Sequence, residues 1–259
     1  MVMHFSIDDF IDALTGLKEA KYQSIFEQPI FAVLRRVHKE CGAVFSCYCF
    51  YENENGSLEE VPSAYAEEFQ ENAHWLRFGF HGLNPDSNYG STKFKAGNWI
   101  DDGNIALLHY TKVMEQLVRI TGGGECIDRF PRVHYYAGTI IDCKAWKGAE
   151  YGICGLITAE DERVCYYHDE VQWKELINHG SYFDEQLNIG FWRTCIRLEN
   201  MQDAAMLEAA LDSINSKQDY LIFTHEKFLE EKRIEAYFVK CGEYAEQNNL
   251  QLGYFYHGK

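Results

Sequence analysis

The sequence predicts an α/β protein whose mostly parallel strands, about seven or eight in number, form a distorted (β/α) barrel. Along its 259 residues, short runs of apolar, β-branched and aromatic residues alternate with longer amphipathic runs. This alternation is typical of βαβ units, in which a helix connects two parallel strands. A doubly wound open sheet is the alternative fold, because it produces the same periodicity.

The expected elements are taken in chain order. The expected strands are short apolar runs bounded by turn-forming residues: 4–6, 43–51, 75–80, 132–136, 153–158, 192–198, 220–224 and 251–256. The expected helices are longer runs with apolar residues three or four positions apart: 29–40, 64–72, 103–121, 203–215 and 225–248. Element lengths of this kind are those of compact α/β domains.

Two stretches interrupt the alternation. Residues 84–97 are polar and rich in turn-forming residues, which predicts a long loop. Residues 160–188 mix charged, aromatic and histidine residues without a clear period, which predicts an inserted hairpin or a lid. Because there is no repeat, linker or low-complexity segment, we expect one domain over residues 1–259 with an irregular insertion around 160–190.

Composition excludes several classes of function. The chain is 46% hydrophobic and 15% aromatic, as in a globular protein, and its net charge of −16 is unsuited to a nucleic-acid backbone. No apolar run reaches the ~18 residues of a membrane span. The first residues lack a signal-peptide pattern, and nine cysteines without a Cys-x-x-Cys pair favour reduced thiols. We therefore expect a cytoplasmic protein that binds neither nucleic acid nor membranes; its oligomeric state has no sequence signal.

Side chains suited to catalysis or metal binding lie at the ends of four expected strands. They are Asp8 and Asp9, His81, Arg132 with His134, and His225. The C-terminal ends of barrel strands meet at one face, so these groups are expected to converge there. Adjacent carboxylates repel each other, which favours a metal ion or an arginine beside them. For the acidic pair alone, the N-terminus of a helix over 10–14 is an alternative explanation.

In their order along the chain, these residues resemble the polysaccharide deacetylases of the NodB-homology superfamily. That family has an Asp-Asp pair after its first strand, a His-x-x-x-His segment, an Arg-x-Pro segment and a late Leu-x-His segment. This sequence offers Ser6-Ile7-Asp8-Asp9, His81, Arg132-Val133-His134 and Phe223-Thr224-His225 in the same order. The resemblance covers most of the chain and implies a metal-dependent deacetylase on a distorted (β/α) barrel.

The resemblance also implies a role for each matched residue. Asp8 would be the general base, and Arg132 would orient it and balance its charge. Asp9 and His81 would be metal ligands. His225 would be the general acid, which suits a side chain whose pKa lies near neutrality. A divalent ion would polarise the acyl carbonyl and activate a water.

The sequence departs from the family pattern after His81. The position four residues on is Pro85, so the second histidine ligand is missing. His134 stands where the arginine segment usually has proline, and on a strand it would share a face with Arg132. We predict that His134 replaces the missing ligand, so that Asp9, His81 and His134 bind a divalent ion, Zn²⁺ being the best suited.

The sequence leaves an alternative open for His134, and a second family segment is missing. His134 could instead stack against Tyr135 or Tyr136 and bind nothing. The Asp-Trp segment that precedes the last histidine in the family is not recognisable here, so the sequence predicts no partner for His225.

These observations predict a hydrolase that deacetylates an N-acetyl or O-acetyl sugar or a related small amide. The substrate would be a small molecule or an oligosaccharide. One alternative is a catalytically inactive sugar-binding or regulatory barrel, which the replacement by Pro85 favours. Another is a glycoside hydrolase in which Asp8 or Asp9 pairs with an acid such as Glu226.

Overall fold

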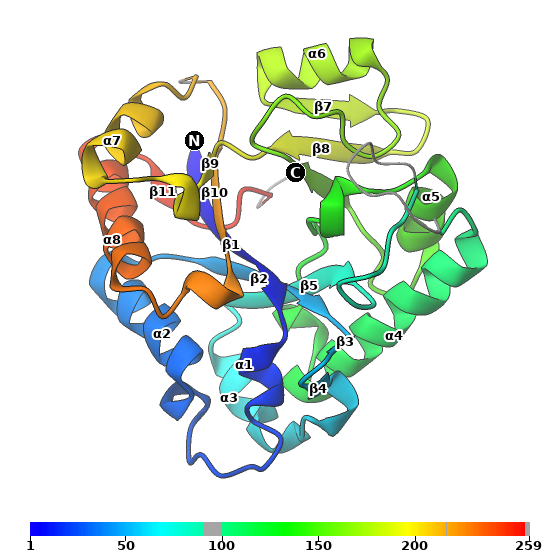
Figure 1. Ribbon diagram of the computed structural model, residues 1–259, viewed down its shortest axis with the longest axis vertical. Coiled ribbons are helices and arrows are strands. Elements are labelled where there is room, and N and C mark those ends of the chain that lie inside the picture. The colour runs from blue at the N-terminus through cyan, green and yellow to red at the C-terminus, as the bar shows by residue number, and fades with distance from the viewer. Residues whose placement is uncertain (91–99, 216, 257–259) are drawn as a thin grey trace.

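The computed structural model describes residues 1–90, 100–215 and 217–256. Its centre is a parallel sheet in the order β5–β2–β1–β10–β9, with the short β11 also paired to β1 (Figure 1). The strands of this sheet are β1 (Val2–Phe10), β2 (Phe45–Phe50), β5 (Leu76–Gly82), β9 (Ile196–Arg197), β10 (Tyr220–His225) and β11 (Gln251–Leu252). All of its pairings are parallel, as the βαβ pattern predicts.

A second sheet has the order β6–β8–β7. Its strands are β6 (Gly155–Thr158), β7 (Ser181–Asp184) and β8 (Ile189–Arg193), and β7 is antiparallel to β8. A further pair, β3 (Glu52–Asn53) and β4 (Gly56–Ser57), forms a small hairpin.

Backbone hydrogen bonds link the two larger sheets on both sides. On one side, Asp128 N donates to Phe78 O of β5 over 2.8 Å, and Ile157 N of β6 donates to Pro131 O over 3.0 Å. On the other, residues 189–197 pair first with β6 and then with β10. The result is an α/β fold with a mostly parallel central sheet, in which regular strand pairing among the described residues does not form a closed ring.

Helices cover the outer faces of the sheets (Figure 1). The α-helices are α1 (Asp12–Thr15), α2 (Pro29–Cys41), α3 (Ala66–Glu71), α4 (Gly103–Thr121), α5 (Ile140–Gly148), α6 (Glu170–His179), α7 (Ala204–Asp212) and α8 (Lys232–Gln247). The 3-10 helices are η1 (Ile25–Glu27), η2 (Leu58–Glu60), η3 (Ser63–Tyr65), η4 (Gly124–Cys126), η5 (His134–Tyr136), η6 (Leu198–Asn200) and η7 (Glu226–Phe228). None of the described helices has both the length and the apolar character needed to cross a bilayer.

Local sequence explains where α2 begins and ends. Pro29 occupies its first turn, where a missing N–H is tolerated, and the Gln28 side chain accepts hydrogen bonds from the next two amides. Gly42 ends the helix with a φ of 75°, a conformation that glycine adopts without strain. These bounds of α2 and those of α4 agree to within one residue with the helices expected over 29–40 and 103–121.

The alternation of side chains along β1 separates two cores. Phe5 packs edge-on against Phe238 of α8, on the side that faces the helices. On the opposite face, His4 contacts the ring of Phe255. A small inner cluster fills this side: Tyr48, Phe130, Ile157, Leu221 and Phe255. Phe255 follows β11, so the C-terminal segment closes the inner side of the sheet.

Several expected elements differ in the structure. The expected strand over 132–136 is wrong: the aromatic residues favour a strand, but η5 forms here, with Tyr135 and Tyr136 at φ values of 58° and 55°. The expected strand over 192–198 is divided between β8 and β9, since it changes its pairing partner. The expected helix over 225–248 begins only at Lys232, because His225 completes β10.

The remaining expectations concern the C-terminus and the two irregular stretches. Only Gln251–Leu252 forms a strand in 251–256, because the chain then turns into the inner cluster. The stretch over 160–188 contains α6 and β7, and β7 forms the expected hairpin with β8. Residues 84–90 form turns without helix or strand, and the rest of that expected loop lies outside the described residues.

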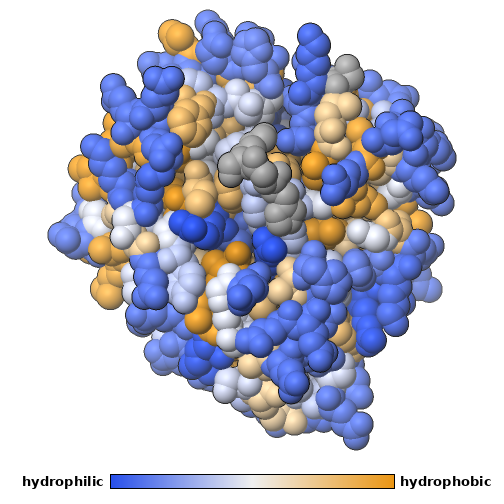
Figure 2. Space-filling model, turned by 180° about the vertical axis from the view of Figure 1, so that it is seen from behind, coloured by the Kyte–Doolittle hydropathy of each residue, from blue (hydrophilic) through white to orange (hydrophobic). Residues whose placement is uncertain are grey.

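Hydrophilic residues cover most of the face seen in Figure 2, and apolar residues appear there in separate patches. This agrees with a chain in which 25% of the residues are charged.

A buried histidine that packs against the β6–β8–β7 sheet makes stability depend on pH. His168 is 5% exposed and packs against Phe191 and Tyr182, and neither of its ring nitrogens has a hydrogen-bond partner in the described part of the chain. Burial lowers the pKa of His168 to about 4. In the unfolded chain, the His168 side chain binds a proton near its usual pKa of ~6.5, so the unfolded state is favoured as the pH falls below that value. The free energy of unfolding should therefore fall by on the order of 3 kcal/mol between pH ~6.5 and pH ~4.

Urea unfolding at pH 7 and pH 4.5 measures this effect. His168→Phe should reduce the loss of stability on acidification, whereas His179→Phe, at an exposed position, should leave it unchanged. Equal acid sensitivity in the wild type and in His168→Phe would contradict the prediction.

Candidate active site

A buried ion pair lies at the C-terminal end of β1. Asp8 is 2% exposed, and Arg132 Nη1 donates to its Oδ1 over 2.7 Å. The same guanidinium donates to Ser6 Oγ at 3.0 Å and to Thr194 Oγ1 at 2.8 Å. Burial opposes the charge of Arg132, but the facing Asp8 carboxylate outweighs it and raises the Arg132 pKa above its usual value. Arg132 therefore supplies the positive charge that a buried carboxylate requires.

A bulge in β1 turns Asp9 towards the same site. In a regular strand, Asp8 and Asp9 would point to opposite faces. Asp9 has a φ of 56°, which aspartate tolerates better than most residues. The pairing of β1 with β2 also shifts here, from Ile7 with Cys47 to Phe10 with Cys49. One extra residue in β1 thus re-aims the Asp9 side chain, as bulges near functional sites commonly do.

A second bulge places His81 opposite. The β2–β5 pairing passes from Cys49 with Phe80 to Phe50 with Gly82, which leaves His81 as the extra residue. Strands β1 and β5 are separated by β2, so their backbones are roughly 10 Å apart. Nevertheless, His81 Nε2 lies 3.1 Å from Asp9 Oδ1. The two bulges and the curvature of the sheet bring these side chains together.

His134 completes a group of three potential metal ligands. Its Nδ1 lies 3.1 Å from His81 Nε2 and 3.5 Å from Asp9 Oδ1. The three ligand atoms all lie within 4.8 Å of one another. The His134 ring also contacts Tyr135, with 4.0 Å between ring centroids. The two rings are tilted by 51° and not stacked, and this contact occurs together with the approach of His134 to Asp9 and His81.

The hydrogen bonds of His81 show that this group fits a cation. Its Nδ1 is 2.6 Å from the Arg132 carbonyl oxygen, which can only accept, so Nδ1 carries the hydrogen. In the neutral ring, Nε2 then directs a lone pair at Asp9 Oδ1, and two lone pairs at this distance require a proton or a metal between them. One carboxylate and two imidazoles are ligands that suit Zn²⁺, and a carbonyl behind a ligating histidine is a common support.

Electrostatics within the group support the same interpretation. Burial alone would raise the pKa of Asp9, but hydrogen bonds with His134 and His81 outweigh it and hold the pKa well below its usual range. For His81, burial lowers the pKa, yet the bond to Asp9 raises it overall. Burial dominates at His134 and lowers its pKa. A proton at this place is therefore held by His81 and Asp9, and a metal ion would compete with it.

Phe50 forms an apolar wall beside the two histidines. It is 1% exposed, and its ring lies edge-on to both His81 and His134 at 4.9 Å. This contact orients both rings and keeps water from that side.

His225 ends β10 on the other side of Asp8. The two residues are directly aligned in the β1–β10 pairing. His225 Nδ1 is 2.5 Å from Glu199 Oε1, which also accepts from Arg197 Nε over 2.7 Å. Burial would raise the pKa of Glu199, but the bond with His225 outweighs it and lowers the pKa to about 2. Glu199 is thus a carboxylate that supports His225.

Sequence reasoning missed Glu199, although a signal was present. Glu199 follows the expected strand over 192–198 at its C-terminal end, the position from which the other site residues were chosen. The family pattern directed attention to an Asp-Trp segment instead.

The geometry does not favour Glu226 as a catalytic acid of a glycoside hydrolase. Its Oε2 accepts from Ile11 N and Asp12 N, and its Oε1 accepts from Ala13 N. Both oxygens are thus engaged by the backbone of α1.

No protein-family model matches the sequence, and no curated protein matches it significantly. Solved structures do match the fold. A predicted polysaccharide deacetylase from Mycobacterium smegmatis superposes with a TM-score of 0.59 and 12% identity, over 97% of this chain and 86% of that one. A family 4 acetyl xylan esterase from Clostridium thermocellum, solved with a cobalt ion, has a TM-score of 0.52 and 8% identity, over 97% and 86% of the two chains.

The chain is therefore an α/β protein with a mostly parallel central sheet. More specifically, it has the NodB-like fold of the polysaccharide deacetylases, which confirms the fold that the sequence resemblance implied. The roles of Asp8, Asp9, His81, Arg132, His134 and His225 stay predictions, because structures at these levels of identity show the fold alone.

Proposed function

We propose that this protein is a metal-dependent hydrolase that removes an acetyl group from an N-acetyl or O-acetyl sugar or a related small amide. The observation that carries the proposal is the convergence of Asp9, His81 and His134 beside the Asp8–Arg132 pair, at the end of a sheet with the deacetylase fold. The cobalt ion in the acetyl xylan esterase is consistent with a divalent metal on this fold.

Asp9, His81 and His134 would hold the metal, with Zn²⁺ the best-suited ion. A divalent cation at this place supplies a Lewis acid that polarises the acyl carbonyl and lowers the pKa of a water. The His81 Nδ1–H bond to the Arg132 carbonyl keeps Nε2 available as a ligand atom. In this chain, His134 therefore provides the nitrogen that Pro85 cannot.

Asp8 would act as the general base. Arg132 holds its carboxylate in place and balances its charge, so that the carboxylate can accept a proton from the attacking water. Because Arg132 also donates to Ser6 and Thr194, the guanidinium itself is held on three sides.

His225 would act as the general acid. Glu199 accepts the hydrogen from Nδ1, which leaves Nε2 to donate a proton to the departing amine or alcohol. The same contact with Glu199 fixes the orientation of the His225 ring. Asp8 and His225 are aligned on adjacent strands, whose backbones are roughly 5 Å apart, so base and acid would act at the same end of the sheet.

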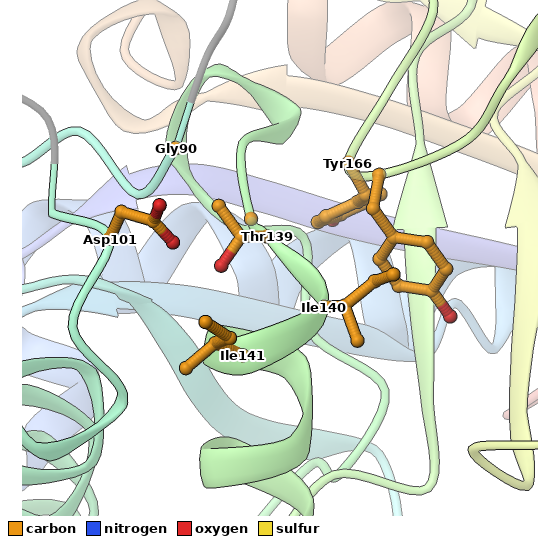
Figure 3. A pocket seen from close by; sticks show the side chains of 8 residues that line it. Gly90, Asp101, Thr139, Ile140, Ile141 and Tyr166 are labelled. Carbon is orange, nitrogen blue, oxygen red and sulfur yellow. The ribbon is translucent and has the colours of Figure 1, made fainter.

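A pocket of about 700 Å³ lies along the segment that follows η5, and its lining, within the described residues, contains none of the proposed catalytic or metal-binding residues. Figure 3 shows Asp101 and Thr139 on one side of it and Ile140 and Tyr166 on the other. Its lining includes residues 138–141, which follow η5, and Tyr166 N donates to Tyr136 O over 2.7 Å. Mixed polar and aromatic linings of this size are typical of sites for small ligands.

Metal content and acetate release test the proposal together. Wild-type protein incubated with Zn²⁺ should hold close to one equivalent, and Asp9→Ala, His81→Ala and His134→Ala should each lose it. The loaded wild type should release acetate from acetylated sugars, and each ligand variant should be slower by about 10²–10³-fold, because a Lewis acid supplies several kcal/mol of transition-state stabilisation.

His74→Ala is the matched control, since His74 is exposed and bonds only locally to Glu71 O; it should retain metal and activity. Metal binding without acetate release from any acetylated sugar would favour the sugar-binding alternative. No metal in any sample would refute the proposal.

A further inference from the structure

The turn between β1 and α1 follows Asp9 directly, and a carboxylate from the other end of the chain holds it. Glu226 Oε2 accepts hydrogen bonds from Ile11 N at 2.8 Å and Asp12 N at 2.9 Å, and Oε1 accepts from Ala13 N at 2.6 Å. The Ile11 side chain cannot cap α1, and no side-chain cap is formed within the turn itself. Glu226 therefore satisfies the first amides of α1 from a distance of more than 200 residues in sequence.

This contact joins the end of β10, which carries His225, to the turn after β1, which carries Asp8 and Asp9. Glu226 directly follows His225, which is aligned with Asp8 in the β1–β10 pairing. On the other side, the bound amides begin two residues after Asp9, whose left-handed conformation re-aims its side chain. Helix α1 has only four residues, so it cannot hold this turn by its own hydrogen bonds.

Packing does not account for an acid at this position. Glu226 is 5% exposed, and a buried carboxylate is unfavourable unless it is well bonded. Burial raises the pKa of Glu226 to about 7, even though three backbone N–H groups oppose the shift. The carboxylate is thus retained in an unfavourable environment, and within the described residues its three hydrogen bonds are to the turn that leaves the site.

We propose that Glu226 is a positioning residue, whose carboxylate fixes the β1–α1 turn against the end of β10. It thereby sets the place of Asp9 relative to His81 and His134, and that of Asp8 relative to His225. The inference rests on the proposed function, in which Asp9 is a metal ligand. Glu226 touches no reacting atom, since both of its oxygens are occupied by backbone amides.

Two substitutions distinguish a residue that positions the proposed metal ligands from one that only stabilises the β1–α1 turn. Glu226→Gln keeps the size of the side chain but turns an amide donor towards backbone donors. Glu226→Asp keeps the charge and shortens the reach. Glu230→Gln is the control, because Glu230 lines the same small cavity as Glu226 but is exposed. Three readouts apply to each protein: hydrogen exchange at the amides of residues 11–13, Zn²⁺ affinity by titration, and kcat and KM for acetate release.

In Glu226→Gln, amide exchange at residues 11–13 should accelerate at least about tenfold, as expected when a bond worth about 1.4 kcal/mol is lost. Zn²⁺ affinity should fall by about 10–100-fold, the usual effect of removing a support behind metal ligands. The value of kcat should fall with little change in KM, and Glu226→Asp should restore part of each loss. Glu230→Gln should match the wild type.

The outcomes distinguish this inference from the proposed function. Faster exchange and a lower unfolding midpoint in Glu226→Gln, with unchanged Zn²⁺ affinity and kcat, would overturn the inference and leave the proposed function intact. Failure of the wild type to bind Zn²⁺ would overturn both. If Glu226→Gln does not fold, the same comparison is made with Glu226→Asp, where unchanged affinity and kcat despite faster exchange would again overturn the inference.

Discussion

Replacing Arg132 with methionine is expected to lower the free energy of unfolding by about 3–5 kcal/mol, because Asp8 would be left buried without a counter-charge. The guanidinium is 1% exposed and lies 2.7 Å from the Asp8 carboxylate. Ser6 and Thr194 would lose a donor at the same time. Acetate release should be abolished as well, since Arg132 holds the proposed base in place.

The midpoint of urea-induced unfolding measures this change. Arg36→Met is the matched control, because Arg36 pairs with Glu235 at 2.7 Å while its side chain is 55% exposed; its effect should stay within about 1 kcal/mol. Adding Asp8→Asn to Arg132→Met should recover part of the stability but no activity. A loss below about 1 kcal/mol in Arg132→Met would show that the buried ion pair is not needed for folding.

Phe255→Ala should destabilise the protein by a similar amount, about 3–5 kcal/mol, because it removes a large ring from the inner cluster. Phe255 is 2% exposed, and its ring contacts those of Phe130 and Trp192 at 5.6 and 5.4 Å. The cavity would lie beneath the ion pair, since Arg132 stacks over Phe223 on the same face of β10 as Leu221. A cavity below a rigid polar layer cannot collapse easily. The expected loss of unfolding free energy therefore lies in the upper part of the range for core substitutions to alanine.

Urea unfolding again provides the measurement, with Phe183→Ala as the control. Phe183 is 53% exposed on β7, so its removal should change stability by no more than about 0.5 kcal/mol. Equal effects of the two alanine substitutions would mean that the C-terminal segment does not close the inner side of the sheet in solution.

The fold could be predicted from the sequence to a large extent. Runs of apolar residues identified β1, β2, β5, β6 and β10, since burial on both faces of a parallel sheet leaves a clear pattern. The spacing of apolar residues over 29–40 and 103–121 predicted α2 and α4 to within one residue. The prediction failed over 132–136, where a strand-like composition adopts two left-handed residues instead. Such a conformation is held by tertiary contacts, among them the bond from Tyr166 N to Tyr136 O at 2.7 Å.

The candidate site was predictable in its members but not in its geometry. The order of strand ends identified Asp9, His81 and His134 as one group, and the structure brings their ligand atoms within 4.8 Å. The reason offered for His134 was wrong, because it lies in η5 and not on a strand beside Arg132. Glu199 was missed, although it follows the expected strand over 192–198; its position 2.5 Å from His225 arises only when the chain is folded.

By itself, the sequence determined the fold class, the end of the sheet at which the polar residues meet, and the chemical types of those residues. The C-terminal ends of parallel strands lie at the same edge of a sheet whatever the details of their pairing. The order of the strands along the chain was therefore enough to predict where these polar residues meet. Only the tertiary structure decided the distances. The bulges at Asp9 and His81 and the bond of Glu226 to the β1–α1 turn depend on pairing between residues far apart in sequence, and no local pattern encodes such pairing because its energy arises only when the chain is folded.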